Sequence, residues 1–145
     1  MHAASQAEAI RHLLARFANS FDRKDWSALR ACLTETVYTD YSDLRGTPAE
    51  SMGADHYVAL REQALQHLQT HHLGGNPEID ISGDSANATL SMMIYRRNQE
   101  GQILHTHCLY QFGLINSEKQ WRIAGIVQKV FWSDGNKAIH SGIQS

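Results

Sequence analysis

The chain has 145 residues and a mass of 16.3 kDa, which is enough for one domain with a real core and too short for two ordinary domains. It carries 13 Lys and Arg against 15 Asp and Glu, with the two signs interspersed, so the basic footprint of a nucleic-acid or anionic-membrane partner is excluded. No apolar run approaches the ~20 residues that span a bilayer, and the first residues lack the build of a signal peptide, so we expect a cytoplasmic protein. Cys32 and Cys108 have no CxxC spacing and are expected to be reduced core residues.

The N-terminal part is expected to form a helical hairpin. Ser5 and Glu8 match a capping box, in which each side chain satisfies a backbone N–H, so a helix is predicted to start there. Apolar residues at helical spacing extend this helix to about Asp22, and they form one stripe: Ile10, Leu13, Leu14, Phe17 and Phe21. Asp25 is expected to cap a second, shorter helix that carries Trp26, Leu29, Cys32 and Leu33.

The next segment predicts a short strand and a third helix. Residues 37–41 are rich in side chains that favour strands. Residues 47–50, with proline at the first helical position, predict a helix start, and Asp55 offers a restart if Gly53 interrupts the first turn. This helix is expected to run to about Leu68.

From His71 onward, alternating apolar and polar residues between turn signals predict four strands joined by hairpins. In the strand after Gly83, Arg96 ends an otherwise apolar face that includes Ile94. In the next strand, one face carries Cys108 and Tyr110, and the opposite face carries Ile103, His105, His107, Leu109 and Gln111. The second face is semi-apolar, so we expect a second copy of the chain to cover it, as a dimer or a trimer.

The element order predicts an α+β fold in which three N-terminal helices cover one face of a curved, mainly antiparallel sheet. An apolar, cone-shaped cavity is expected between the two layers. Residues 1–133 are expected to form this single domain, and residues 134–145 a loosely held tail.

Three segments carry a family resemblance. They are FANSFDRKDWSALRACLTETVYTDYSDL at residues 17–44, THHLGG at residues 70–75 and WRIAG at residues 121–125. Together they resemble scytalone dehydratase and the wider SnoaL-like, NTF2-like superfamily, over about residues 10–132. The helix-hairpin pattern FDRKDW is common in SnoaL-like proteins, whereas Asp40 and Tyr41 combined with the His72 segment indicate the scytalone dehydratase branch.

The resemblance implies a lyase that needs no metal or other cofactor and that removes water from a β-hydroxy ketone on a bicyclic ring. Tyr41 matches the tyrosine that polarises the carbonyl, His72 matches a histidine that acts as acid and base, and Asp22 matches a carboxylate that supports the histidine. Two positions depart from the family: Phe21 replaces a tyrosine, and Arg96 falls where the family has a second histidine. A pocket asparagine of the family falls at Tyr110.

The residues alone support the same kind of chemistry. Histidine near neutral pKa is an efficient base for a proton next to a carbonyl, and a tyrosine donor can stabilise the developing oxyanion. The resemblance and this chemistry together imply a small apolar cyclic substrate, with catalytic His72, Tyr41 and Asp22 and with a substrate-binding set that comprises Arg96, Tyr110, Phe21, Ile94 and Cys108.

Several alternatives remain open from the sequence. Strand alternation lets only one of His71 and His72 face the cavity, and Arg96 either pairs with Asp22 or extends its head to solvent. His105 and His107 have a spacing that suits one metal ion but lack a third ligand nearby. Isomerisation, cyclisation, epoxide hydrolysis and simple ligand binding are alternatives on the same fold.

Overall fold

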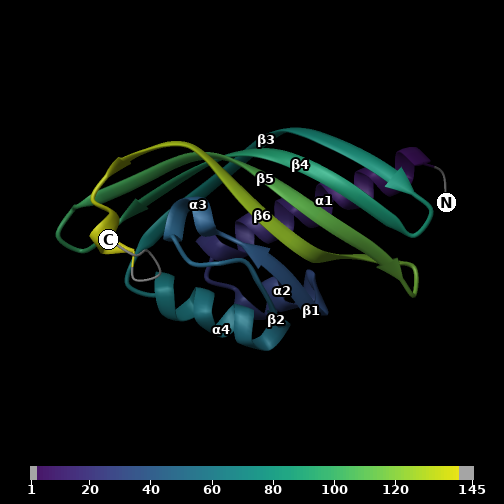
Figure 1. Ribbon diagram of the computed structural model, residues 1–145, viewed down its shortest axis with the longest axis horizontal. Coiled ribbons are helices and arrows are strands. Elements are labelled where there is room, and N and C mark those ends of the chain that lie inside the picture. The colour runs from purple at the N-terminus through teal and green to yellow at the C-terminus, as the bar shows by residue number, and fades with distance from the viewer. Residues whose placement is uncertain (1–2, 141–145) are drawn as a thin grey trace.

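The computed structural model describes residues 3–140, in which one sheet arches over a layer of helices (Figure 1). The sheet has six strands in the order β2-β1-β6-β5-β4-β3. All neighbouring strands are antiparallel except β1 and β6, which are parallel, so the sheet is mixed. The predicted α+β fold with helices on one face of a curved sheet is therefore confirmed.

The helical hairpin opens the chain. Helix α1 spans Ala3–Asp22 and buries the predicted apolar stripe against the sheet. The capping-box prediction is wrong, because Ser5 already lies inside this helix. Helix α2 spans Trp26–Ala31, and the Asp25 side chain caps it as predicted by accepting a hydrogen bond from the Ala28 backbone N–H at 3.1 Å.

The segment between the hairpin and the large sheet differs most from the prediction. Strand β1 (Leu33–Asp40) starts earlier than expected and ends before Tyr41, and the short helix α3 (Ser42–Arg45) was not predicted. The predicted helix start at residues 47–50 is wrong, because β2 (Glu50–Gly53) pairs with β1 there. Helix α4 (Ala54–Leu65) begins near the predicted restart.

The four predicted strands are confirmed as β3 (Gln69–Ser82), β4 (Ser85–Arg97), β5 (Ile103–Ser117) and β6 (Gln120–Gly135). The predicted alternation in β4 and β5 is confirmed too, because the even-numbered positions through Arg96 and Leu114 are the buried ones. Cys32 and Cys108 are buried and unbridged, as expected.

A bulge in β3 sets which histidine faces inward. The register of β3 against β4 shifts between Gly75 and Glu78, where Asn76 takes a left-handed φ of 52°. His72 and Ile79 are an odd number of positions apart and would face opposite sides of a regular strand, but the extra residue lets both face the helices. His72 is accordingly 7% exposed, whereas His71 is exposed.

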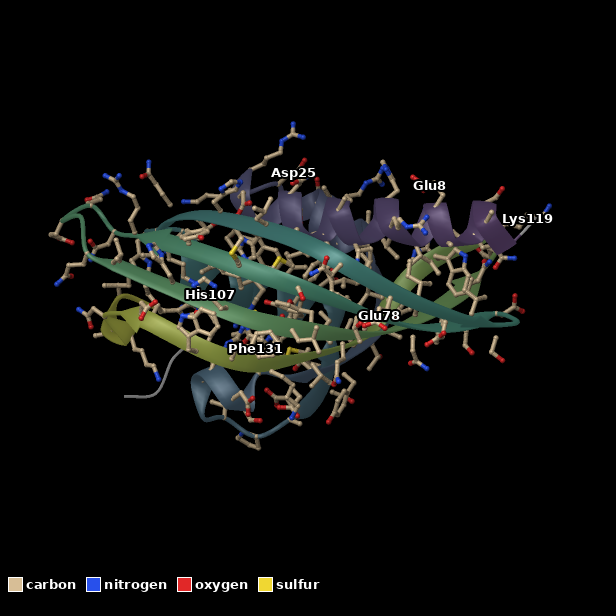
Figure 2. The ribbon with its side chains drawn as sticks, turned by 90° about the horizontal axis from the view of Figure 1, so that it is seen from above. Glu8, Asp25, Glu78, His107, Lys119 and Phe131 are labelled. Carbon is tan, nitrogen blue, oxygen red and sulfur yellow. The ribbon has the colours of Figure 1, made fainter. Side chains whose placement is uncertain are left out.

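The outer face of the sheet is rich in aromatic side chains, and Figure 2 looks onto it, with His107 and Phe131 labelled. Phe131 is 61% and Trp132 54% exposed, and the His107 ring stacks on Trp132 with 4.3 Å between the ring centroids. That a second copy of the chain covers this outer face stays a prediction.

The C-terminal segment differs from the loose tail expected after residue 133. Strand β6 continues to Gly135, and a 3-10 helix follows at Lys137–Ile139. Ile139 and His140 are buried, and the Ile139 carbonyl lies 2.8 Å from the His67 ring nitrogen Nε2. The last five residues of the expected tail lie outside the described range. Between residues 3 and 140, no helix is long and apolar enough to cross a membrane.

Candidate functional site

A small cavity lies between the sheet and the helices. Its volume is about 20 Å³, and its wall comprises Phe21, Tyr41, Leu44, Arg45, Arg61, Leu65, His72, Arg96, Tyr110, Gln128 and His140. Five of the residues singled out from the sequence meet there: Phe21, Tyr41, His72, Arg96 and Tyr110. The wall is not apolar as expected, because arginine, tyrosine and histidine side chains provide much of it.

His72 and Asp22 form the most tightly bonded pair of this site. The His72 ring nitrogen Nδ1 lies 2.6 Å from Asp22 Oδ1, and the His72 backbone N–H donates to Asp22 Oδ2 at 2.7 Å. The Thr70 hydroxyl also donates to Asp22 Oδ1, at 2.9 Å. Asp22, at the end of α1, thus holds β3 by three hydrogen bonds and acts through His72, because it does not line the cavity itself.

The His72 environment favours a neutral ring whose Nε2 is a base. Burial is the main cause that lowers the pKa of His72, while the hydrogen bond and the charge of Asp22 act in the opposite direction. A carboxylate can only accept, so Nδ1 carries the hydrogen when the ring is neutral and Nε2 keeps its lone pair. Phe21 stacks on this ring, with centroids 5.1 Å apart and planes 24° apart, and therefore fixes its orientation rather than bonding to a ligand.

Tyr41 occupies the N-cap position of α3 and lines the cavity, and its hydroxyl meets that of Tyr57, a tyrosine of α4. The Tyr41 and Tyr57 hydroxyl oxygens are 2.7 Å apart. One hydroxyl donates to the other, so one O–H hydrogen of the pair remains for a further acceptor. The Arg45 guanidinium lies 3.8 Å from the centre of the Tyr41 ring, which places a positive charge against the same phenol.

Arg96 does neither of the two things expected from the sequence. Its side chain is buried, with 4% of the residue exposed, and Nη1 donates to the Thr106 hydroxyl at 2.9 Å. Within the described chain, no ion pair joins Arg96 to Asp22, and the guanidinium does not reach solvent. The reason is Thr106, which occupies an inward position on the neighbouring strand β5 and offers an acceptor inside the protein.

The other expected substrate contacts divide into two groups. Tyr110 lines the cavity, and its hydroxyl lies 3.3 Å from the Gln128 side-chain nitrogen. Ile94 and Cys108 are buried but do not line the cavity. The Cys108 sulfur instead lies 3.6 Å from the side-chain nitrogen of Gln128. Ile94 and Cys108 therefore belong to the packing behind the site.

The sequence analysis missed Arg45, Tyr57, Arg61, Gln128 and His140. A signal existed for one of them, because Arg61 falls on the buried stripe of the third predicted helix, which also carries Ala54, Tyr57, Ala64, Leu65 and Leu68. An arginine on such a stripe is unusual, since charged side chains are seldom fully buried without a partner. His140 gave no signal, because it lies in a segment that was expected to be loose.

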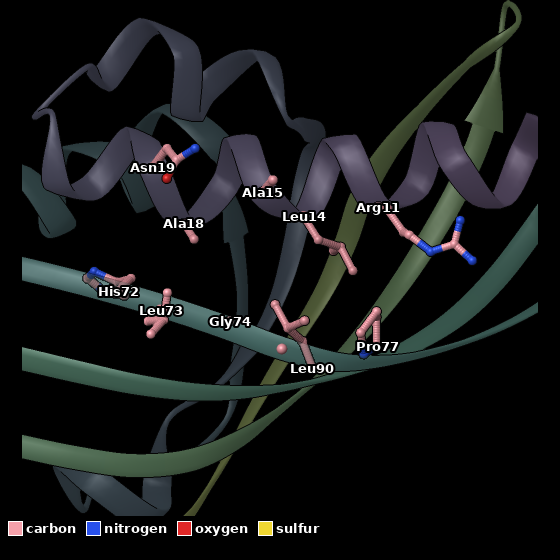
Figure 3. Close-up of a pocket in the computed structure, with 11 residues that line it drawn as sticks. Arg11, Leu14, Ala15, Ala18, Asn19, His72, Leu73, Gly74, Pro77 and Leu90 are labelled. Carbon is pink, nitrogen blue, oxygen red and sulfur yellow. The ribbon is translucent and has the colours of Figure 1, made fainter.

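A second hollow lies beside the cavity, between α1 and β3, and is drawn in Figure 3. This groove has a volume of about 260 Å³ and a mostly apolar wall that includes Leu14, Ala18, Gly74 and Leu90. A Cβ on Gly74 would lie 2.8 Å from a Leu90 methyl group, so glycine keeps this wall open. His72 lines both hollows and therefore separates the groove from the cavity.

His105 and His107 lie on the outer face of the sheet, as expected. The His105 ring packs edge-on against Tyr95 with centroids 4.5 Å apart, and His107 stacks on Trp132. Across residues 3–140, no group of three or more His, Cys, Asp and Glu side chains is placed to hold a metal ion.

Residues 2–127 match the SnoaL-like domain family, and the chain belongs to that family. Scytalone dehydratase-like protein claB of Passalora fulva is 26% identical over 130 residues, which cover 81% of this chain and 80% of the relative. Among solved structures, Kfla4162 from Kribbella flavida superposes with a TM-score of 0.89 at 18% identity, over 95% of this chain and 98% of the other. Hexachlorocyclohexane dehydrochlorinase LinA-type3 from Novosphingobium barchaimii gives a TM-score of 0.78 at 16% identity, over 94% and 93%.

The relatives and the structures establish different things. The solved structures share the fold, which is of the NTF2-like kind and hosts many chemistries. Membership of the family, together with relatives named after scytalone dehydratase, supports a function of the dehydratase or isomerase type.

Proposed function

We propose that the protein removes water from a cyclic β-hydroxy ketone, with His72 as the base and Tyr41 as the donor to the ketone oxygen. The observation that carries the proposal is the buried His72–Asp22 pair, with 2.6 Å between Nδ1 and Oδ1. This bond directs the basic Nε2 away from Asp22. His72 lines the same cavity as Tyr41, so a base and a hydroxyl donor face the same space in this proposal.

The reaction divides into two proton transfers. His72 Nε2 takes a proton from the carbon next to the ketone, and the electron pair of that C–H bond moves to the carbonyl oxygen to form an enolate. The Tyr41 O–H donates to this oxygen while Tyr57 donates to Tyr41, which stabilises the developing charge. The enolate then expels the β-hydroxyl group, which leaves as water with the proton that His72 returns.

Each residue around the pair has a part in this scheme. Asp22 positions the His72 ring and stabilises its protonated form, as a carboxylate does in other His–Asp pairs. Phe21 holds the ring by stacking, and burial keeps it neutral before the reaction by lowering its pKa. The neighbouring charges of Arg45 and Arg96 add to the positive potential that an enolate needs.

The size of the cavity sets a condition on the proposal. A volume of about 20 Å³ holds roughly one water molecule, whereas pockets for ring-sized ligands measure about 300–1,000 Å³. A cyclic substrate therefore requires the cavity to widen, either toward the adjacent groove of about 260 Å³ or at the wall that His140 supplies.

The experiment is an elimination assay on the purified protein with a panel of hydroxylated tetralones. The conjugated product is followed by ultraviolet absorbance, and the loss of one water is verified by mass spectrometry. We expect His72→Ala to lower kcat about 10²–10⁴-fold while the protein stays folded. The matched control is His71→Ala, because this neighbour is exposed on the other face of β3 and should leave kcat unchanged.

Two further outcomes carry information. Unchanged turnover in folded His72→Ala contradicts the proposal. Ala15→Trp, which places a large side chain in the groove beside α1, tests whether the substrate uses that hollow: a raised KM places it there, and an unchanged KM places it in the cavity alone.

A further inference from the structure

The cavity holds more positive charge than one enolate oxygen would balance. Arg45, Arg61 and Arg96 all line it, and they come from α3, α4 and β4. In the part of the chain that the structure describes, no Asp or Glu lines this cavity, and Asp22 is engaged by His72 and Thr70. Arginine keeps its charge under all ordinary conditions, so these charges are not removed by deprotonation.

Arg61 is a buried cation with an unsatisfied hydrogen-bond donor. It is 6% exposed, and its Nε atom has no hydrogen-bond partner in the described structure. The Arg45 Nε atom is in the same situation. Both guanidinium groups lie near the Tyr41 ring, at 3.8 Å for Arg45 and 5.5 Å for Arg61, but a ring face offers no lone pair to the N–H groups.

The surrounding groups respond to this concentration of charge. The pKa of Arg45 is lowered to about 10, mainly by burial and then by the charge of Arg61. The pKa of His140 is lowered to about 2, first by burial and then by the charges of Arg96, Arg45 and Arg61. A buried cation without an anion is costly, so proteins seldom keep one unless a ligand uses it.

We infer that the cavity binds the carboxylate group of its ligand, with Arg61 as the main partner and Arg45 and Arg96 beside it. A carboxylate is planar and accepts two parallel N–H bonds, which suits a guanidinium. It would supply acceptors for the unpaired Nε–H groups and would balance the repulsion among the three cations. The inference rests on the proposed function in one respect, since it makes the substrate a cyclic hydroxy ketone that also carries a carboxylate.

The test is a binding measurement that needs no turnover. The probes are 2-naphthoate and 2-naphthamide, which have the same ring and nearly the same shape and differ in charge. Neither probe has a hydroxyl group to eliminate, so binding is measured by isothermal titration calorimetry even if the proposed elimination fails. We expect the wild-type protein to bind 2-naphthoate at least about 10-fold more tightly than 2-naphthamide.

Four variants locate the anion and separate its binding from the elimination. Arg61→Met should abolish the preference for 2-naphthoate, and Arg61→Lys should keep part of it. Arg11→Met is the matched control, because Arg11 lines the neighbouring groove and should leave the preference unchanged. His72→Ala should also keep the preference while it loses elimination activity, which separates the two proposals.

Two kinds of result would overturn the inferred carboxylate site. Equal affinity for the two probes, or no binding of either, rejects a carboxylate site. A preference that survives in Arg61→Met but disappears in Arg11→Met places the anion in the groove and rejects the assignment to the cavity.

Discussion

Two parts of the cavity wall satisfy their polar groups in opposite ways. We call them the His72 end, with Asp22 behind it, and the arginine end, with Arg45, Arg61 and the neighbouring His140. At the His72 end, both oxygens of Asp22 accept hydrogen bonds from β3 at 2.6–2.9 Å, and the ring is stacked on Phe21. At the arginine end, the buried Nε atoms of Arg45 and Arg61 have no acceptor in the described structure. The polar groups named at the His72 end have their hydrogen-bond partners within the protein, whereas the two Nε atoms of the arginine end do not. We therefore call the His72 end the complete end.

This difference separates two tasks within one cavity. A base must keep its orientation and tautomer before the substrate arrives, so its partners belong to the protein. A binding group gains most when its partner is the ligand, because a preformed internal ion pair would compete with the ligand for the same charge. Under the inferred carboxylate site, the arginine end would lower the stability of the free protein and favour the complex, a trade that is common at functional sites.

The largest expected effect concerns the complete end. Asp22→Asn should lower kcat of the proposed elimination about 10²–10⁴-fold, because an amide can donate to Nδ1 and then places the ring hydrogen on Nε2, where the base is needed. The measurement is kcat by the absorbance assay, with thermal unfolding recorded for the same sample.

Asp84→Asn, in the exposed turn between β3 and β4, is the matched control and should keep wild-type kcat. If Asp22→Asn keeps the full rate while His72→Ala loses it, Asp22 does not position the base. The complete end would then be a structural tie between α1 and β3.

The fold was largely predictable because side-chain alternation survives in the long strands. The inward positions of β4 and β5, including Arg96 and Tyr110, follow from a period of two that no irregularity interrupts before the cavity. The segment between residues 41 and 53 was not predictable, because α3 and β2 are too short for periodicity. β2 depends on its pairing with β1, and α3 is tied to β6, where the Val130 backbone N–H donates to the Asp43 carboxylate at 3.2 Å.

The site was predictable only in part, for a related reason. His72 and Tyr41 came from the family resemblance, and the bulge that turns His72 inward lies between Gly75 and Glu78, directly after two adjacent glycines. The arginine end was missed, because Arg45 lies on the unpredicted helix α3 and His140 on a segment that looked too polar to be buried. Arg61 was missed as well, although it lies on the buried face of the third predicted helix.

A second prediction concerns the free energy of unfolding at acidic pH. In the unfolded chain, His72 and His140 take up protons as the pH falls through about 6.5, whereas in the folded protein burial lowers the pKa of both rings, that of His140 to about 2. Below pH 6.5 the unfolded chain therefore binds more protons, and the free energy of unfolding falls as the pH falls. Each fully depressed histidine contributes at most about 1.4 kcal/mol per pH unit.

The measurement is urea unfolding at pH 7 and pH 5. His140→Asn should reduce the loss of stability between these two values, because it removes one of the two buried rings. His56→Asn, at an exposed position of α4, should leave the loss as it is in the wild type. An equal loss in the wild type and in His140→Asn would show that burial and the neighbouring arginine charges do not keep His140 neutral.

The smallest expected effect is a gain in stability at the arginine end. It distinguishes the two ends most directly, because a substitution there should raise the free energy of unfolding. Arg61→Met should raise the free energy of unfolding at pH 7 by about 1–2 kcal/mol, since it replaces a buried cation that has no described acceptor by an apolar side chain of similar length. Arg97→Met, with the same substitution on the exposed neighbour of Arg96, should change it by less than about 0.5 kcal/mol. A destabilised Arg61→Met protein would mean that contacts with the Tyr41 and Tyr57 rings outweigh the cost of the charge, and that Arg61 belongs to the core.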